Sequence, residues 1–147
     1  MRNIRNLTYV AAALGAGVVV GWSASSLRAE PEKPASLVYE LRTYTTHEGR
    51  LPALNDRFKN HTMKLFEKHG MKNVIYCTPI DKEGKPVENT LVYLIAHKSQ
   101  QAARDSFAAF GKDPEWIAAR TDSEKDGKIV AKVESQFLVP TDYSPMK

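Results

Sequence analysis

The stretch TLVYLIAH, residues Thr90–His97, decides the fold of this 147-residue chain. Almost every position is apolar, and β-branched and aromatic residues dominate, which is typical of a strand at the centre of a sheet. Side chains alternate along a strand, so Val92 and Leu94 share one face. The other face then carries Leu91, Tyr93 and Ile95. We therefore expect this strand to be buried on both faces.

The segments around this strand predict three more strands and two helical regions. Apolar residues at intervals of three and four predict an amphipathic helix over 50–69, which ends at Gly70. A second helical region begins after Ser99 and restarts at Asp113, an N-cap residue followed by proline. The further strands are predicted at 37–44, 73–80 and 128–139.

The resulting order, βαββαβ, is that of an α+β ferredoxin-like domain. Such a domain has a four-stranded antiparallel sheet with both helices on one face. The helices can cover only one side of the apolar central strand, and an exposed apolar sheet face favours association. We therefore expect a homodimer in which a second copy covers the other face.

The first 29 residues have the composition of a secretory signal peptide. Arg2 and Arg5 precede an uncharged run over 6–27, and small residues follow its apolar centre. We expect export to the periplasm or the medium, with 30–36 as a linker and 37–147 as the folded domain. The alternative is an uncleaved membrane anchor formed by residues 6–27.

Charge gives no reason to expect nucleic acid as a partner. The chain has a formal net charge of +4 and a pI near 9.2. Of its 21 Lys and Arg residues, three lie in the leader, which has no acidic residue, so 18 basic residues face 17 acidic ones in the rest. A nearly neutral domain has no general electrostatic attraction for nucleic acid.

Several blocks of the chain, in order, resemble the NIPSNAP family. They include YELRTYTTHEGRL at 39–51, RFKNHTMKLFEKHGM at 57–71 and DPEWIAAR at 113–120. The resemblance extends over about 37–145 and implies a dimeric α/β barrel, in which two four-stranded sheets enclose an internal space. Proteins with this fold include oxygenases, isomerases, haem-handling proteins and binding proteins, so the fold does not dictate a function.

Charged residues two positions apart on the first and last strands are candidate barrel-lining residues. Glu40 and Arg42 share one face of the first strand, and Lys132 and Glu134 share one face of the last. We expect the four to form one mutually neutralised charge network. The alternative is a polar cluster that orients a ligand or shifts a catalytic pKa.

Three further side chains, Tyr44, His61 and Trp116, are candidates to line a cavity. His61 lies in the apolar stripe of the first helix, where we expect a buried, hydrogen-bonded imidazole rather than a general base or haem ligand. Trp116 is expected to pack helix against sheet, with a pocket wall as the alternative.

No motif for a metal, nucleotide or other cofactor is present in the sequence. No histidine pair has the spacing of a helical zinc motif, so we expect no metal site and no cofactor. Cys77 is the only cysteine, and we expect it to be a small buried apolar residue, with an intermolecular disulfide as the alternative.

Two functions remain. The first, which we favour, is a non-catalytic exported dimer that binds a small apolar molecule or a protein partner. The second is an oxygenase or isomerase that uses the barrel cavity without a tightly bound cofactor. The missing metal and nucleotide motifs favour the first.

Overall fold

The structure, a computed structural model, describes residues 37–146, so the predicted leader at 1–29 and linker at 30–36 lie outside the described residues. The strands are β1 (Val38–Thr46), β2 (Lys72–Cys77), β3 (Thr90–His97) and β4 (Val130–Leu138). The helices are α1 (Leu51–Arg57), the π-helix η1 (Phe58–Thr62), α2 (Met63–Lys68), α3 (Gln100–Lys112) and α4 (Pro114–Ser123).

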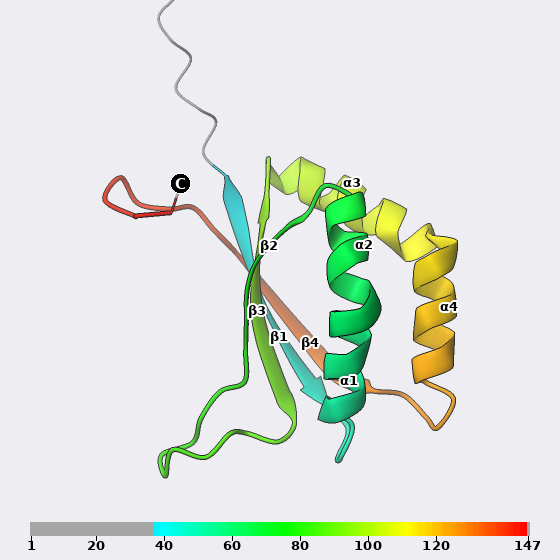
Figure 1. Cartoon of the computed structure of the whole chain (residues 1–147). Coiled ribbons are helices and arrows are strands. Elements are labelled where there is room, and N and C mark those ends of the chain that lie inside the picture. The colour runs from blue at the N-terminus through cyan, green and yellow to red at the C-terminus, as the bar shows by residue number, and fades with distance from the viewer. Residues whose placement is uncertain (1–36, 147) are drawn as a thin grey trace, which may run out of the picture. The chain divides into compact units, whose positions relative to one another are not determined.

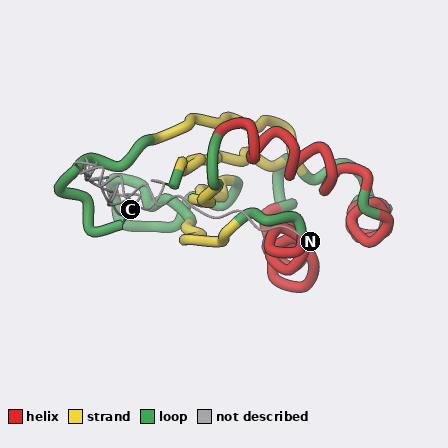
Figure 2. Tube along the Cα trace, turned by 90° about the horizontal axis from the view of Figure 1, so that it is seen from above, coloured by secondary structure: helices red, strands yellow, loops and turns green. Residues whose placement is uncertain are grey.

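The four strands form one antiparallel sheet in the order β2-β3-β1-β4. All the helices lie on the same side of this sheet (Figure 1). Seen from above, α3 runs crosswise, whereas the other helices are viewed nearly end-on (Figure 2). The predicted α+β ferredoxin-like fold is therefore confirmed.

The middle of strand β3 is buried on one face only. Leu91, Tyr93 and Ile95 face the helices and are at most 4% exposed. Val92 and Leu94 face away from the helices and are only half-buried. The expected burial on both faces is thus wrong for the middle of the strand in a single copy of the domain. At the end of the strand, Ala96 on the second face is 1% exposed and lies in one hollow with Tyr39 and Met146.

Helices α3 and α4 begin at the predicted caps. The Ser99 hydroxyl accepts a hydrogen bond from the Ala102 backbone N–H at 3.0 Å. The Asp113 carboxylate accepts one from the Glu115 N–H at 2.9 Å and so restarts the chain as α4. These two caps set the crosswise direction of α3 and the return of α4 along the sheet.

Asp113 also ties α2 to the junction of α3 and α4. Its carboxylate oxygen lies 2.9 Å from the Lys68 amine and 2.7 Å from His69 Nε2. Hydrogen bonds from Lys68 and then His69 outweigh the effect of desolvation and hold the pKa of Asp113 well below its usual range. The contact is possible because Gly70 ends α2 with φ +78°, a conformation that favours glycine.

A continuous helix was predicted for the first helical region, but the structure interrupts it with the π-helical turn η1. The Met63 N–H bonds to the carbonyl of Phe58, five residues earlier. The Thr62 hydroxyl donates to the Arg57 carbonyl at 3.2 Å, which satisfies a carbonyl in the widened turn. Such turns are frequent at functional sites, and this one follows Arg57 directly.

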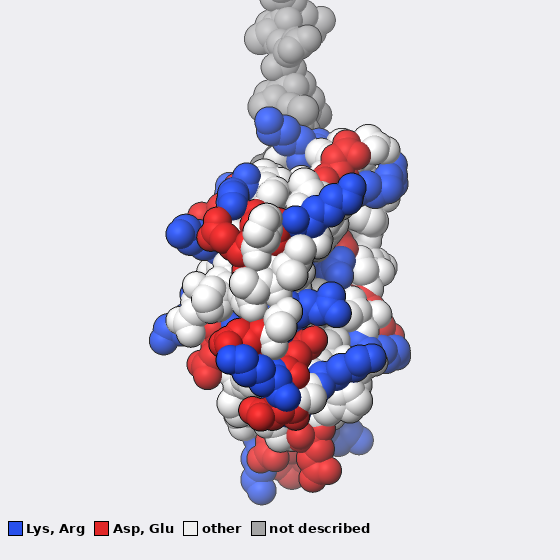
Figure 3. Space-filling view, turned by 90° about the vertical axis from the view of Figure 1, so that its right-hand side faces the viewer, with Lys and Arg blue, Asp and Glu red and all other residues white. Residues whose placement is uncertain are grey.

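One side of the surface is mixed in charge (Figure 3). On the side that Figure 3 shows, Lys and Arg are interspersed with Asp and Glu rather than separated from them. No helix within residues 37–146 combines the length and the apolarity that crossing a bilayer would require.

Candidate functional site

An open cavity of about 370 Å³ lies between the sheet and the helices. Its walls come from β1 and β4 on one side and from α1, η1, α2, α3 and α4 on the other. The lining residues are Tyr44, Arg57, Phe58, Thr62, Phe66, Phe110, Trp116, Arg120, Glu124, Lys128, Val130 and Val133.

Five aromatic rings form the apolar part of this cavity and hold one another in place. Tyr44 meets Phe58 edge-on at 5.9 Å between ring centroids. Phe110 contacts Phe66 at 5.0 Å and Trp116 at 4.4 Å. Aromatic contacts of this kind add to the free energy of burial and restrict ring rotation. The cavity walls are therefore fixed by the core rather than by mobile surface loops.

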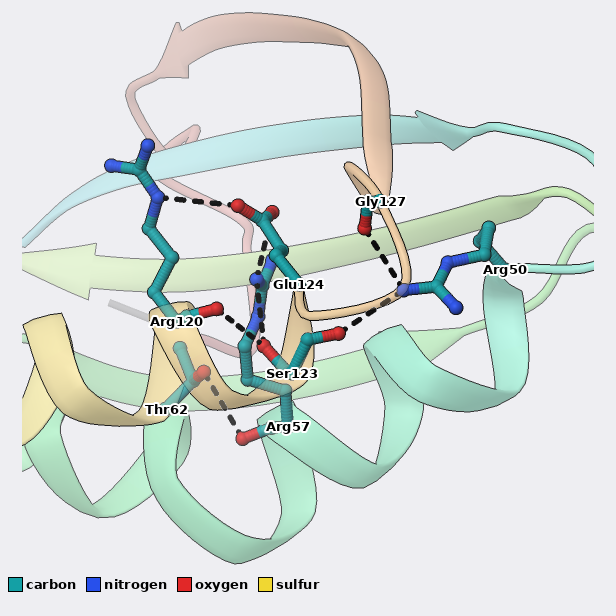
Figure 4. Close-up of polar contacts among 7 residues, drawn as sticks. All are labelled: Arg50, Arg57, Thr62, Arg120, Ser123, Glu124 and Gly127. Carbon is teal, nitrogen blue, oxygen red and sulfur yellow. Dashed lines mark hydrogen bonds and ion pairs between the residues drawn. The ribbon is translucent and has the colours of Figure 1, made fainter.

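Arg57 is the most deeply buried of the charged residues that line the cavity. It is only 5% exposed, and its guanidinium lies 5.2 Å from the centre of the Trp116 ring. One terminal nitrogen, Nη1, donates to Glu124 Oε1 at 3.1 Å and to Ser123 Oγ at 3.3 Å (Figure 4). Arg57 thereby joins the first helical region to the end of α4.

Glu124 is shared by two arginines. Arg57 contacts one carboxylate oxygen of Glu124, and the Arg120 Nε lies 3.4 Å from the other. Burial by itself would raise the pKa of Glu124, but the hydrogen bond and charge of Arg57 outweigh this effect and keep the pKa below its ordinary value. Glu124 is therefore ionised at neutral pH.

A second polar cluster is centred on Glu40, whose side chain is 3% exposed. Its carboxylate accepts hydrogen bonds from Arg42 and Ser135, both at 2.5 Å, and contacts His97 Nε2 at 3.1 Å. Arg42 also donates to the Tyr44 hydroxyl at 3.3 Å, and Tyr44 lines the cavity. Tyr44 thus connects the Glu40 cluster to the cavity wall.

The ionised form of Glu40 is favoured by these contacts. Burial by itself would raise its pKa above the ordinary value of 4.5. Hydrogen bonds from His97 and Ser135, followed by the charge of Arg42, outweigh burial and lower it. The Arg42 guanidinium further lies 4.6 Å from the centre of the Phe107 ring, which shields the pair from solvent.

The structure brings together some of the predicted site residues. Tyr44 and Trp116 line the cavity, so the pocket-wall role considered for Trp116 is present. Trp116 also packs on Phe110 of α3, which is a contact between two helices rather than the expected one between helix and sheet. Glu40 and Arg42 form the expected ion pair, but they lie opposite Ile95 and Tyr93 and so face the helices. Their predicted place on the barrel face, away from the helices, is therefore wrong.

Lys132 and Glu134 do not join that pair. They form a separate ion pair at 2.9 Å, and their side chains are 64% and 57% exposed. In the register of β4 on β1, Ser135 lies opposite Arg42, whereas Glu134 lies opposite Thr43 and so faces away from the helices. The prediction of one four-member network is therefore wrong.

His61 lies on the outer surface, so its predicted burial is also wrong. Thr62, the next residue, is 2% exposed and faces inward. The turn η1 contains more residues per turn than an α-helix, and His61 falls on its solvent side. A buried histidine does occur in the domain, but it is His97 at the end of β3, which the sequence reasoning did not single out.

Cys77 is exposed, contrary to the prediction of a buried thiol. It pairs with Val92 on the sheet face away from the helices. Within residues 37–146, no three His, Cys, Asp or Glu side chains come close enough together to hold a metal ion.

Arg57, Arg120, Glu124 and Lys128 were missed by the sequence reasoning. A charged residue directly before Phe58, inside an apolar stripe, was the available signal for Arg57. The others follow no motif, since they reach the cavity that Arg57 lines only after the chain has returned as α4.

Comparison with known proteins agrees with this architecture. The family model named NIPSNAP matches residues 39–145. Among proteins with curated descriptions, none matches this sequence.

Solved structures from several bacteria share the fold. A NIPSNAP family protein of unknown function from Agrobacterium tumefaciens is 21% identical with a TM-score of 0.63, covering 78% of this chain and 97% of that one. A NIPSNAP-like domain protein from Burkholderia xenovorans is 15% identical with a TM-score of 0.61, covering 76% and 90%. SnoaB, a cofactor-independent oxygenase from Streptomyces nogalater, is 14% identical with a TM-score of 0.50, covering 76% and 99%.

Identities this low establish a shared fold and no shared activity. The family model, in contrast, matches nearly the whole described domain, from β1 to the segment beyond β4. This chain belongs to the NIPSNAP family.

Proposed function

We propose that the domain binds a small, largely aromatic molecule in the cavity between sheet and helices. The observation that carries the proposal is the ring of five mutually packed aromatic side chains around an open space of about 370 Å³. Ligand pockets in proteins have this size range, mainly apolar walls and a few placed polar groups.

The polar groups of the cavity favour binding over catalysis. Among the residues that line it, none is a histidine or a cysteine. Glu124 is ionised and occupied by two arginines, so it is poorly placed to take a proton from a bound molecule. The cavity can therefore hold and orient a ligand, while its own side chains offer no free general base.

A fluorescent neutral aromatic probe, N-phenyl-naphthylamine, tests this proposal. Its emission rises in an apolar site, and titration gives a dissociation constant. Val133→Trp places a large ring at the cavity wall and should weaken binding at least about tenfold, which corresponds to a loss of about 1.4 kcal/mol. Val139→Trp, at a position 74% exposed and outside the cavity lining, is the matched control and should bind normally.

Absence of probe binding, or equal binding by both variants, would overturn the proposal. Native mass spectrometry of protein purified from its own host provides an independent measurement. It should show an added mass on the wild type that Val133→Trp lacks.

A second candidate function is that of an oxygenase or isomerase working without a tightly bound cofactor. The supporting observation is the contact of Glu40 with His97 at 3.1 Å, next to the cavity wall formed by Tyr44. A carboxylate paired with an imidazole is an arrangement that can accept a proton, and SnoaB has a similar fold. A change in mass of the bound molecule on exposure to oxygen would favour an oxygenase, and a changed retention time at unchanged mass would favour an isomerase. Glu40→Gln should abolish either change.

We further propose that the domain is a homodimer joined through the sheet face away from the helices. The apolar residues that this face presents are Leu41, Ile75, Cys77, Val92 and Leu94. Ile75 is 52% exposed, which is high for an apolar residue on a strand. A second copy fits because the adjoining Lys132–Glu134 pair carries both signs, so two copies related by a two-fold axis can place opposite charges against each other.

The segment beyond β4 lies on the same side. It extends away from the helices (Figure 1), and Tyr143 within it is 84% exposed. Leu94→Lys should give a folded monomer, whereas Ile95→Lys, which changes the helix-facing side, should unfold the domain. Light scattering at micromolar concentration with circular dichroism separates these outcomes, and a monomeric wild type would refute the dimer.

We propose, finally, that the protein is exported and that residues 1–29 are removed. The support is the arginine-rich start, apolar middle and small-residue end of that segment. N-terminal sequencing of protein from its native envelope should begin between Ala24 and Glu30. An intact N-terminus in the membrane fraction would instead indicate the anchor over 6–27.

A further inference from the structure

The polar end of the cavity carries more positive than negative charge. Its charged lining residues are three cations and one anion, namely Arg57, Arg120, Lys128 and Glu124. Glu124 contacts both arginines, and Lys128 makes no ion pair within the described part of the chain. One carboxylate thus pairs with two of the three cations, and the lining has two positive charges in excess.

The negative end of helix α4 does not cancel this excess. The carbonyl groups at a helix C-terminus carry partial negative charge, and α4 ends at this side of the cavity. Arg50, however, donates from Nη2 to the Ser123 carbonyl at 3.1 Å and to the Gly127 carbonyl at 3.0 Å (Figure 4). Its guanidinium neutralises the helix end from outside the cavity lining.

Arg57 retains hydrogen-bonding capacity at the boundary between the charged and the aromatic parts. Its Nε is buried and has no hydrogen-bond partner among residues 37–146. The guanidinium is held in place by Glu124 and by the face of Trp116. A buried donor without a partner is unfavourable unless a ligand or water accepts its hydrogen bond.

We infer that the molecule bound in this cavity is an aromatic acid. Its rings occupy the space among the packed aromatic side chains, and its carboxylate, or an equivalent sulfonate or phosphate, lies at the mouth near Arg120 and Lys128. Arginine and lysine recognise such anionic groups through charge-assisted hydrogen bonds. This inference rests on the proposed binding function and adds the charge and the orientation of the ligand.

Two probes that share one aromatic skeleton separate the inference from the binding function. N-phenyl-naphthylamine is neutral, and anilinonaphthalene sulfonate carries one added sulfonate. We expect the sulfonate to bind about five- to tenfold more tightly at low salt. Because the charges at the mouth are exposed, added salt should reduce this preference, while binding of the neutral probe should change little.

The variant Arg120→Gln with Lys128→Gln removes both excess charges. It should bind the two probes with equal affinity. Lys82→Gln with Lys85→Gln makes the same change of net charge on the exposed β2–β3 connection and should keep the preference.

The possible results distinguish the two ideas. If the neutral probe binds and the sulfonate binds no better, or if the charge variant keeps the preference, the anionic ligand is refuted and the aromatic site stands. If neither probe binds the wild type, or if Val133→Trp leaves binding of both intact, the proposed function fails and the inference fails with it.

Discussion

Replacing Arg42 by alanine tests what holds the polar side of the sheet together. The substitution leaves the Glu40 carboxylate, 3% exposed, with only His97 and Ser135 as hydrogen-bond partners. It also removes the guanidinium that lies 4.6 Å from the centre of the Phe107 ring. The buried charge of Glu40 then has no opposite charge unless His97 becomes protonated.

The expected loss of stability follows from these contacts. Removing one partner of a buried ion pair costs about 3–5 kcal/mol, and a partly desolvated cation–π contact contributes about 0.5–2 kcal/mol. The Arg42 side chain is 15% exposed, so water can enter beside Glu40 and offset part of the loss. We therefore expect the free energy of unfolding to fall by about 2–4 kcal/mol. For a domain of this size that corresponds to a decrease in Tm of about 8–16 °C.

Thermal unfolding followed by circular dichroism at one protein concentration measures this change. Lys132→Ala breaks an exposed pair of the same chemical kind and should cost at most about 1 kcal/mol. Arg42→Met combined with Glu40→Leu should recover at least half of the loss, because no unpaired charge remains. A Tm for Arg42→Ala as high as that of Lys132→Ala would refute the reasoning.

The pH dependence gives a second measurement on the same variant. The pKa of Glu40 is lowered on folding, so its contribution to stability is present above the ordinary value of 4.5 and is lost as the pH falls through the folded-state pKa. Arg42 is one cause of that lowering. Without it the folded-state pKa of Glu40 lies closer to the ordinary value, so the variant should lose less stability than the wild type as the pH falls below about 4.5.

Three further predictions concern other contacts. Asp113→Asn keeps a cap on α4 but loses the charge that Lys68 and His69 contact, so Tm should fall near neutral pH. The pKa of Asp113 is lowered on folding, so its contribution to stability is present above the ordinary value of 3.8 and is lost as the pH falls through the folded-state pKa. The Tm of the variant should therefore depend less on pH in acid than that of the wild type. Cys77 should react slowly with a maleimide in the wild type and faster in monomeric Leu94→Lys, and equal rates would contradict the dimer. Thr62→Val removes the hydrogen bond to the carbonyl of the widened turn and should cost about 1 kcal/mol in denaturant unfolding, with Thr62→Ser as the control that keeps the hydroxyl.

The order of the elements could be predicted because local signals agree with the fold. The apolar run at 90–97 is β3 without change of boundary, and Ser99 and Asp113 are side-chain caps. The Glu40–Arg42 pair was also predictable, since residues two apart on a strand share a face whatever the strand pairs with.

The faces of β4 could not be predicted from its own sequence. Alternation divides the strand into two sets, but each set contains polar residues, so neither is marked as the inner one. The pairing with β1 decides which set of β4 side chains faces the helices, and the register of that pairing shifts between Thr45 and Thr46. For this reason Ser135, rather than Lys132 or Glu134, reaches Glu40.

The candidate cavity was hidden for a different reason. Its charged residues come from the first helix and from the end of α4, which are separated by more than half of the described chain. The π turn also displaced the inward position from His61 to Thr62, and a search for regular helical spacing does not detect such a turn.

The π turn also constrains the length of this helical region. Leu65 and Phe66 fix α2 in the core, and Arg57 lies just before the turn. Deleting a single residue such as Lys59 would convert the turn to regular α-helix and rotate everything before it by about 100° relative to α2. Arg57 would then swing away from Trp116 and Glu124. Insertions and deletions within Phe58–Thr62 are thus a route by which relatives of this domain could exchange one cavity charge for another without any change in the sheet.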